Sequence, residues 1–134
     1  MLSGCGIAGL KISNIDAYPP DLYVQWRTPG RSDLDTKKAL LECGFKNPYN
    51  YGLTTPEDWN VNHDISLDVC MEYLGYAKTG WGPRSPVCSY KPYAIQKSCQ
   101  PGADIIKPSV KRRLNNQFCK YERAGGFNLP ECQP

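Results

Sequence analysis

The sequence SDLDTKKALLECG, residues 32–44, decides the fold that we predict for this chain. Ser32 with Asp35 three residues later resembles a capping box, in which the two residues bond to each other's backbone at a helix start, although Glu or Gln is usual at the second position. Gly44 lies where a glycine commonly ends a helix. The stretch therefore predicts a helix whose last turn carries Cys43, on the same face as Leu40.

A second helix is predicted to begin near Asp64 or Ser66 and to end at Gly75. Its apolar positions recur at i, i+3, i+4 and i+7, the spacing of a helix with one buried face: Leu67, Cys70, Met71 and Leu74. Cys70 is therefore expected to turn inward, as Cys43 is. Two inward cysteines at facing helix positions make Cys43 with Cys70 the preferred first disulfide.

The seven cysteines of the chain divide into Cys5 and six others: Cys43, Cys70, Cys88, Cys99, Cys119 and Cys132. No C-x-x-C pair is present and the chain has a single histidine, whereas zinc sites usually draw two ligands from one tight knuckle. We therefore expect three disulfides, no metal and no cofactor, in an oxidising compartment. Cys88 with Cys99 would pin a loop and Cys119 could reach Cys132, but many pairings are possible and the sequence leaves the connectivity open.

The remaining segments predict short elements between loops. Leu22, Val24 and Trp26 alternate with more polar residues, which indicates a strand over residues 22–27. Residues 45–63 are predicted to be a loop with Trp59 packed back onto the domain, and residues 77–108 to be irregular or short-stranded. A third helix is predicted after Ser109 and up to Gly125-Gly126, with an apolar stripe of Val110, Leu114, Phe118 and Tyr121.

These elements predict a small disulfide-stapled α+β domain over residues 21–134, with about three short helices, one or a few short strands and long loops. Leu, Ile, Val and Phe make up only 26 of the 134 residues, so the expected core is thin. Each disulfide that closes a loop contributes roughly 3 kcal/mol, and three of them rival the net stability of a small domain. No stretch approaches the ~18 apolar residues of a transmembrane helix.

The tetrapeptide Leu2-Ser3-Gly4-Cys5 resembles a lipobox, the bacterial signal in which a cysteine is acylated and becomes the mature N-terminus. Cys5 would then be a membrane anchor, and residues 6–20, which end in Pro19-Pro20, an extended tether. Only Met1 precedes this tetrapeptide, so the basic and apolar parts of a signal would have to lie upstream. The alternative is an ordinary Cys5 thiol, but the odd cysteine count favours acylation.

A wider resemblance runs over residues 23–76 and is carried by Trp26-x-x-Pro29-Gly30-x-Ser32, the helix ending in Cys43, and Cys70-Met71-x-x-x-Gly75-Tyr76. This order resembles small Gram-negative cell-envelope lipoproteins of unknown function. The resemblance implies outer-membrane location, since Gly6 is not the Asp that favours inner-membrane retention. It also implies stable attachment through several acyl chains, where one chain would hold only marginally.

Asn62-His63-Asp64 is the fragment most suggestive of catalysis, because histidine is the usual general base and an aspartate can orient it. The alternative is that Asp64 caps the second helix and His63 is an exposed loop residue. Two carboxylate pairs, Asp33 with Asp35 and Glu57 with Asp58, are explained by helix-start and turn chemistry. We therefore predict no catalytic residues and no enzymatic activity.

Five cations on the third predicted helix are the candidates for binding an anionic partner: Lys111, Arg112, Arg113, Lys120 and Arg123. A simple solvated face is the alternative. Tyrosines in residues 48–52 and 89–93 indicate either a protein-binding surface or a cover for the sparse core.

The interpretation that follows is a lipid-anchored outer-membrane lipoprotein with a non-catalytic structural or protein-interaction role. Its expected partners are the membrane and another envelope protein, not nucleic acid. The alternatives are a soluble periplasmic or secreted binding protein of the inhibitor or immunity type, and an envelope enzyme centred on His63.

Overall fold

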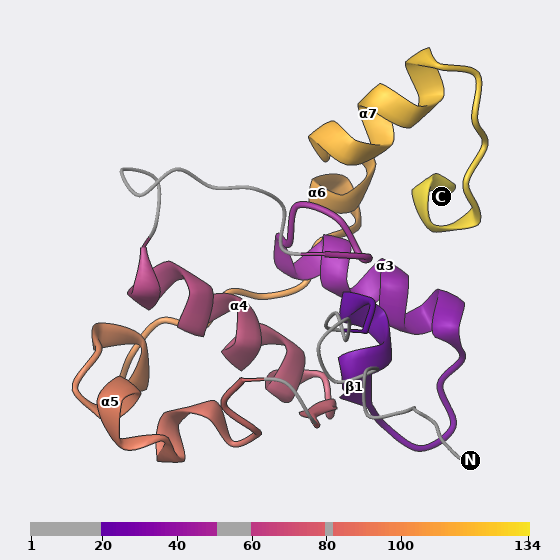
Figure 1. Cartoon of the computed structure of the whole chain (residues 1–134). Coiled ribbons are helices and arrows are strands. Elements are labelled where there is room, and N and C mark those ends of the chain that lie inside the picture. Colours follow the sequence, from indigo (N-terminus) through magenta and orange to yellow (C-terminus); the bar gives the residue numbers. More distant parts are fainter. Residues whose placement is uncertain (1–19, 51–59, 80–81) are drawn as a thin grey trace, which may run out of the picture.

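The computed structural model describes residues 20–50, 60–79 and 82–134, shown in colour in Figure 1. Within these ranges the protein is a small α+β domain of short helices, long connecting loops and one two-stranded antiparallel sheet. The fold class predicted from the sequence is therefore confirmed. The predicted anchor at Cys5, the tether up to Pro19 and the predicted packing of Trp59 lie outside the described residues.

The predicted first helix is α3, Asp33–Cys43, and its ends form as the sequence indicates. The Ser32 hydroxyl accepts from the Asp35 N–H at 3.1 Å, and the Asp35 carboxylate accepts from the Ser32 N–H at 3.0 Å. These bonds favour the charged carboxylate and lower the pKa of Asp35. Gly44 has φ of 111° and donates its N–H to the carbonyls of Leu40 and Leu41, which ends the helix.

Two groups of buried side chains lie on different sides of α3. Leu40 and Cys43 belong to the larger group, together with buried side chains of α3 itself and of the segments before and after it: Leu22, Trp26, Ala39, Phe45, Leu67, Cys70, Met71 and Tyr76. Leu41 belongs to a smaller group with Cys119 and Cys132, near the C-terminus. A helix buried on two sides organises the whole domain, because both halves of the chain pack onto it.

The second helix, α4, spans Val61–Tyr73 and begins earlier than predicted. Asn60 is its N-cap, since the Asn60 side-chain oxygen accepts from the His63 N–H at 3.0 Å. Leu67, Cys70 and Met71 are buried, which confirms the predicted inward face. The predicted Cys43–Cys70 disulfide joins α3 to α4.

The strand predicted over residues 22–27 is wrong for its first four residues. Leu22–Gln25 form a 3-10 turn, η1, and only Trp26–Arg27 form a strand, β1, which pairs with β2, Ala77–Lys78. Residues i and i+3 share a face in a 3-10 turn, so Leu22 and Gln25 are buried while Val24 is exposed. The Leu22 N–H donates to the carbonyl of Tyr49, a bond across the domain that the alternating pattern could not reveal.

The third predicted helix is divided into α6, Val110–Leu114, and α7, Gln117–Ala124. Asn116 caps α7 by accepting from the Phe118 N–H, and it donates its side-chain N–H to the carbonyl of Phe45 at 2.9 Å. Asparagine competes in this way for backbone groups that would otherwise continue a helix. The predicted apolar stripe is therefore wrong, and Val110 and Tyr121 at its ends are exposed.

Residues 77–108 contain short helical turns and no strand beyond β2 within the described part of the chain. These turns are η3, Val87–Ser89, α5, Lys91–Ala94, and η4, Lys97–Cys99. The Cys88–Cys99 disulfide closes residues 88–99 into a loop, which we call the 88–99 arch. In Figure 1 the arch lies on the outside of α4, around the label α5.

The chain closes with η5, Pro130–Cys132, which packs on α3. Cys132 is bonded to Cys119 of α7 and both cysteines are buried. All three pairings favoured by the sequence are therefore present, and together they use the six cysteines of the domain.

Candidate interaction surfaces

The fragment around His63 lies at the start of α4. His63 is exposed in the first turn of α4, in a helix and not in a loop, and Asn60 caps this helix in place of Asp64. Every cysteine among the described residues is in a disulfide, so none of them offers a thiolate nucleophile. Within residues 20–50, 60–79 and 82–134, no three His, Cys, Asp or Glu side chains are grouped to hold a metal ion.

The two carboxylate pairs have different positions. Asp35 belongs to the capping box of α3, where its carboxylate is occupied by the Ser32 N–H. Asp33 precedes it in the same helix turn. Glu57 and Asp58 lie outside the described residues.

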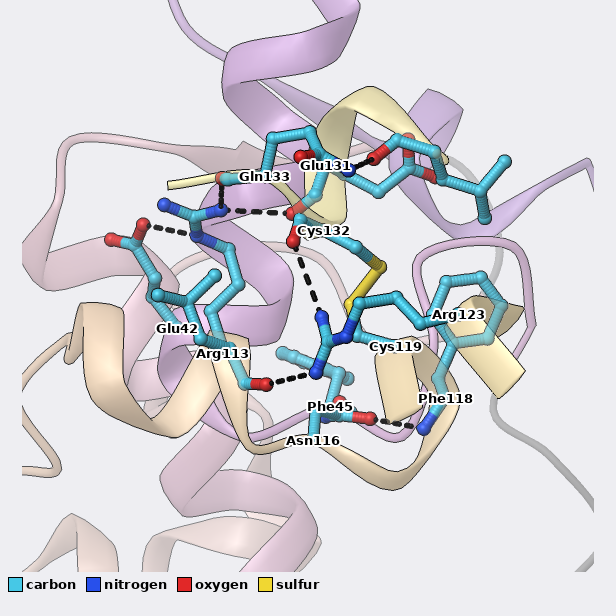
Figure 2. The surroundings of a disulfide bond; sticks show 12 residues. Glu42, Phe45, Arg113, Asn116, Phe118, Cys119, Arg123, Glu131, Cys132 and Gln133 are labelled. Atoms are coloured by element: carbon cyan, nitrogen blue, oxygen red, sulfur yellow. Dashed lines mark hydrogen bonds and ion pairs between the residues drawn. A yellow bond between two sulfur atoms is a disulfide. The ribbon is translucent and has the colours of Figure 1, made fainter. Parts of the chain in front are cut away.

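The five cations predicted to bind an anionic partner do not form one surface, because Arg113 is buried with 3% of its surface exposed. Figure 2 shows its guanidinium between the Glu42 carboxylate and two carbonyls of the C-terminal tail. The Nε atom donates to Glu42 at 2.8 Å, and one terminal nitrogen donates to the carbonyls of Glu131, at 3.0 Å, and Gln133. Arg113 therefore fastens the tail to α3 and has no side available for a partner.

Two further arginines of the set also bond within the domain. Arg112 donates to the carbonyls of Glu42 and Lys107, and Arg123 donates to the carbonyls of Leu114 and Cys132. Lys111 and Lys120 are exposed. The sequence could not distinguish these roles, because arginines that bind backbone carbonyls have the same spacing as arginines that face water.

A buried ion pair joins α4 to β2. The Lys78 ammonium lies 3.7 Å from the Asp68 carboxylate, and both side chains are at most one-tenth exposed. Burial raises the pKa of Asp68 to about 7, against the opposing effect of Lys78. Burial and the charge of Asp68 also raise the pKa of Tyr93, which belongs to α5 in the 88–99 arch. Tyr93 is half-buried and packs against Tyr90.

The 88–99 arch exposes its other large side chains. Tyr90 packs edge-on against Tyr93, with ring centroids 4.9 Å apart, and is 45% exposed. Ile95, just beyond α5, is 80% exposed. Of the two tyrosines in residues 89–93, Tyr90 is therefore exposed and Tyr93 is half-buried. The prominent apolar residue Ile95 was missed because one isoleucine in a loop gives no periodic signal.

The tyrosines of residues 48–52 are used differently. The Tyr49 hydroxyl donates to the Glu131 carboxylate at 2.6 Å, and burial together with this carboxylate raises the pKa of Tyr49. The Lys37 ammonium lies 4.6 Å and 5.1 Å from the ring centroids of Tyr23 and Tyr49. Tyr49 is thus part of the domain's internal packing, and Tyr51 lies outside the described residues.

Two other surface features give less indication of the kind of partner that would bind there. A hollow of about 380 Å³ lies between the end of α3 and the start of α7, lined by Gly44, Lys46, Asn116 and Gln117. Tyr121 and Phe127 are exposed at the end of α7, where the Phe127 ring lies over Gly125.

Comparison of the chain with protein-family models, curated proteins and solved structures finds no match. The described helices are all too short or too polar to cross a membrane.

Proposed function

We propose that this protein is a lipid-anchored component of the outer membrane, attached through Cys5, whose stapled domain has a non-catalytic structural or protein-interaction role. The observation that carries the proposal is the pairing of the other six cysteines with one another. None of the other cysteines in this sequence is left to bond Cys5. An unpaired cysteine in an oxidising compartment is reactive, and acylation removes this reactivity because it blocks the thiol.

The interaction role is supported by the distribution of exposed apolar side chains on a rigid domain. Large apolar residues are exposed on several elements, and three disulfides hold the segments that carry or flank them: Tyr73, Tyr90, Ile95, Tyr121 and Phe127. A surface that is already ordered loses little conformational entropy when it binds. The expected partner is another protein of the cell envelope.

The anchor is tested by expressing the gene with its own upstream region in a Gram-negative host. Extraction with detergent and mass spectrometry should find a mature chain that starts at Cys5 and carries acyl groups. A Cys5→Ser variant is the matched control, and it should be released from the membrane fraction in an unprocessed or soluble form. Recovery of the wild type with an unmodified Cys5 would contradict the anchor and favour a soluble periplasmic or secreted binding protein.

A further inference from the structure

We propose that the 88–99 arch docks on an anionic phospholipid surface, with Ile95 and Tyr90 entering the interface and Lys91 and Lys97 facing the lipid phosphates. This contact would be additional to the proposed anchor and does not require an acylated Cys5. The argument rests on how the arch is held, what it exposes and how it is charged.

The arch is held at its base and stands free at its tip. Both η3 and η4 pack against α4, while α5 packs mainly against η3. The Ser98 N–H donates to the Asn62 side chain at 2.7 Å, and the Val87 N–H donates to the Glu72 carboxylate at 2.8 Å. With the disulfide across the base and Tyr93 half-buried, the tip is held on the outer side of α4 (Figure 1).

The tip exposes apolar side chains. Residues 90–95 are all exposed except for the half-buried Tyr93, and Ile95 is the most exposed of the large apolar side chains in the described residues. A protein partner would need a matching cavity, whereas a fluid bilayer interface accepts a projecting side chain without a preformed shape. Tyrosine suits the same environment because its ring is apolar and its hydroxyl remains in water.

The charge of this region complements an anionic surface. No Asp or Glu occurs in residues 73–103, while Arg84, Lys91 and Lys97 are exposed. Lysine can keep its ammonium at the phosphates while its alkyl stem covers apolar surface.

Two of the three acidic side chains of α4 beneath the arch already have partners within the domain. Asp68 is paired with Lys78, and the Glu72 carboxylate accepts from the Val87 N–H. Asp64 is exposed in the first turn of the helix. The exposed part of the arch itself therefore carries only positive charge.

The test measures sedimentation of the full-length, oxidised protein, produced without acylation of Cys5, with vesicles of phosphatidylcholine, with and without phosphatidylglycerol. We expect binding only to the vesicles that contain phosphatidylglycerol. Each lysine near an anionic surface contributes roughly a fivefold gain in affinity, so Lys91→Gln with Lys97→Gln should weaken binding by about 25-fold. Ile95→Ser should weaken it by about tenfold.

The matched control is Lys111→Gln with Lys120→Gln, which removes the same charge from exposed lysines of α6 and α7 and should leave binding within about twofold. All these substitutions are at exposed positions, and mass spectrometry without reductant should find three disulfides in each variant. An equal loss in the control pair would overturn the assignment to the arch. Absence of binding to phosphatidylglycerol vesicles would overturn the membrane proposal. If the protein then binds soluble polyglutamate, the partner is an acidic polypeptide.

Discussion

Replacing Arg113 by methionine is the most informative test of how the domain is held together. Methionine fills much of the same space but cannot donate to Glu42 or to the carbonyls of Glu131 and Gln133. Breaking a fully buried ion pair costs roughly 3–5 kcal/mol, because the remaining charge loses its partner. The Glu42 side chain is 21% exposed and can regain water, so we expect a loss at the lower end of this range, about 3 kcal/mol in the free energy of unfolding.

The assay is urea unfolding with the disulfides intact. For an m-value of roughly 2 kcal/mol per M, this loss lowers the unfolding midpoint by about 1.5 M. The matched control is Arg112→Met, at the neighbouring position, where the side chain is exposed and also bonds to two backbone carbonyls. That variant should lose less than about 1 kcal/mol, since water replaces its bonds. Equal midpoints for the two variants would refute the claim that the buried arginine fastens the tail.

Three other outcomes are expected. The pKa of Asp68 is about 7 in the folded protein and near 4 in an unfolded chain, so between these pH values the folded state binds one more proton than the unfolded state. The contribution of Asp68 to the free energy of unfolding therefore falls as pH rises from about 4 to 7. Asp68→Asn should remove this slope from urea midpoints measured across about pH 4–8. Gly44→Ala should lower the free energy of unfolding, measured by thermal unfolding, by roughly 1–2 kcal/mol, which is more than the loss expected for Gly30→Ala. Both glycines have positive φ, but an added Cβ meets other side chains only at Gly44. Equal losses in the two variants would exclude this contact as the cause. Replacing Cys43 and Cys70 together by alanine should lower the free energy of unfolding by roughly 3–4 kcal/mol, and a variant as stable as the wild type would show that this bridge is dispensable.

Local patterns determined the parts of the fold that depend on neighbouring residues. The capping box at Ser32, the glycine end at Gly44 and the apolar face of α4 are set by contacts within a few positions, so they were predicted correctly. The disulfide pairings were favoured for a related reason. Helix phase turns Cys43 and Cys70 inward, and the other two pairs are close in sequence.

Patterns failed where a distant residue supplies the competing bond. An alternating stretch became a 3-10 turn because the carbonyls of Pro48 and Tyr49 accept from its first N–H groups. One predicted helix became two because Asn116 caps the second and bonds to Phe45. The accepting carbonyls are far away in sequence, so the periodicity of apolar residues could not predict these bonds.

The sequence alone determined the α+β class, the inward faces of α3 and α4, and the division of seven cysteines into Cys5 and three plausible pairs. Only the tertiary structure decided which charged and apolar side chains remain available to a partner. It buried Arg113 against Glu42 and the C-terminal tail, and it left Ile95 exposed at the tip of the 88–99 arch. The reason is physical, because the sequence records which groups can bond, whereas folding determines which of them are already bonded within the protein.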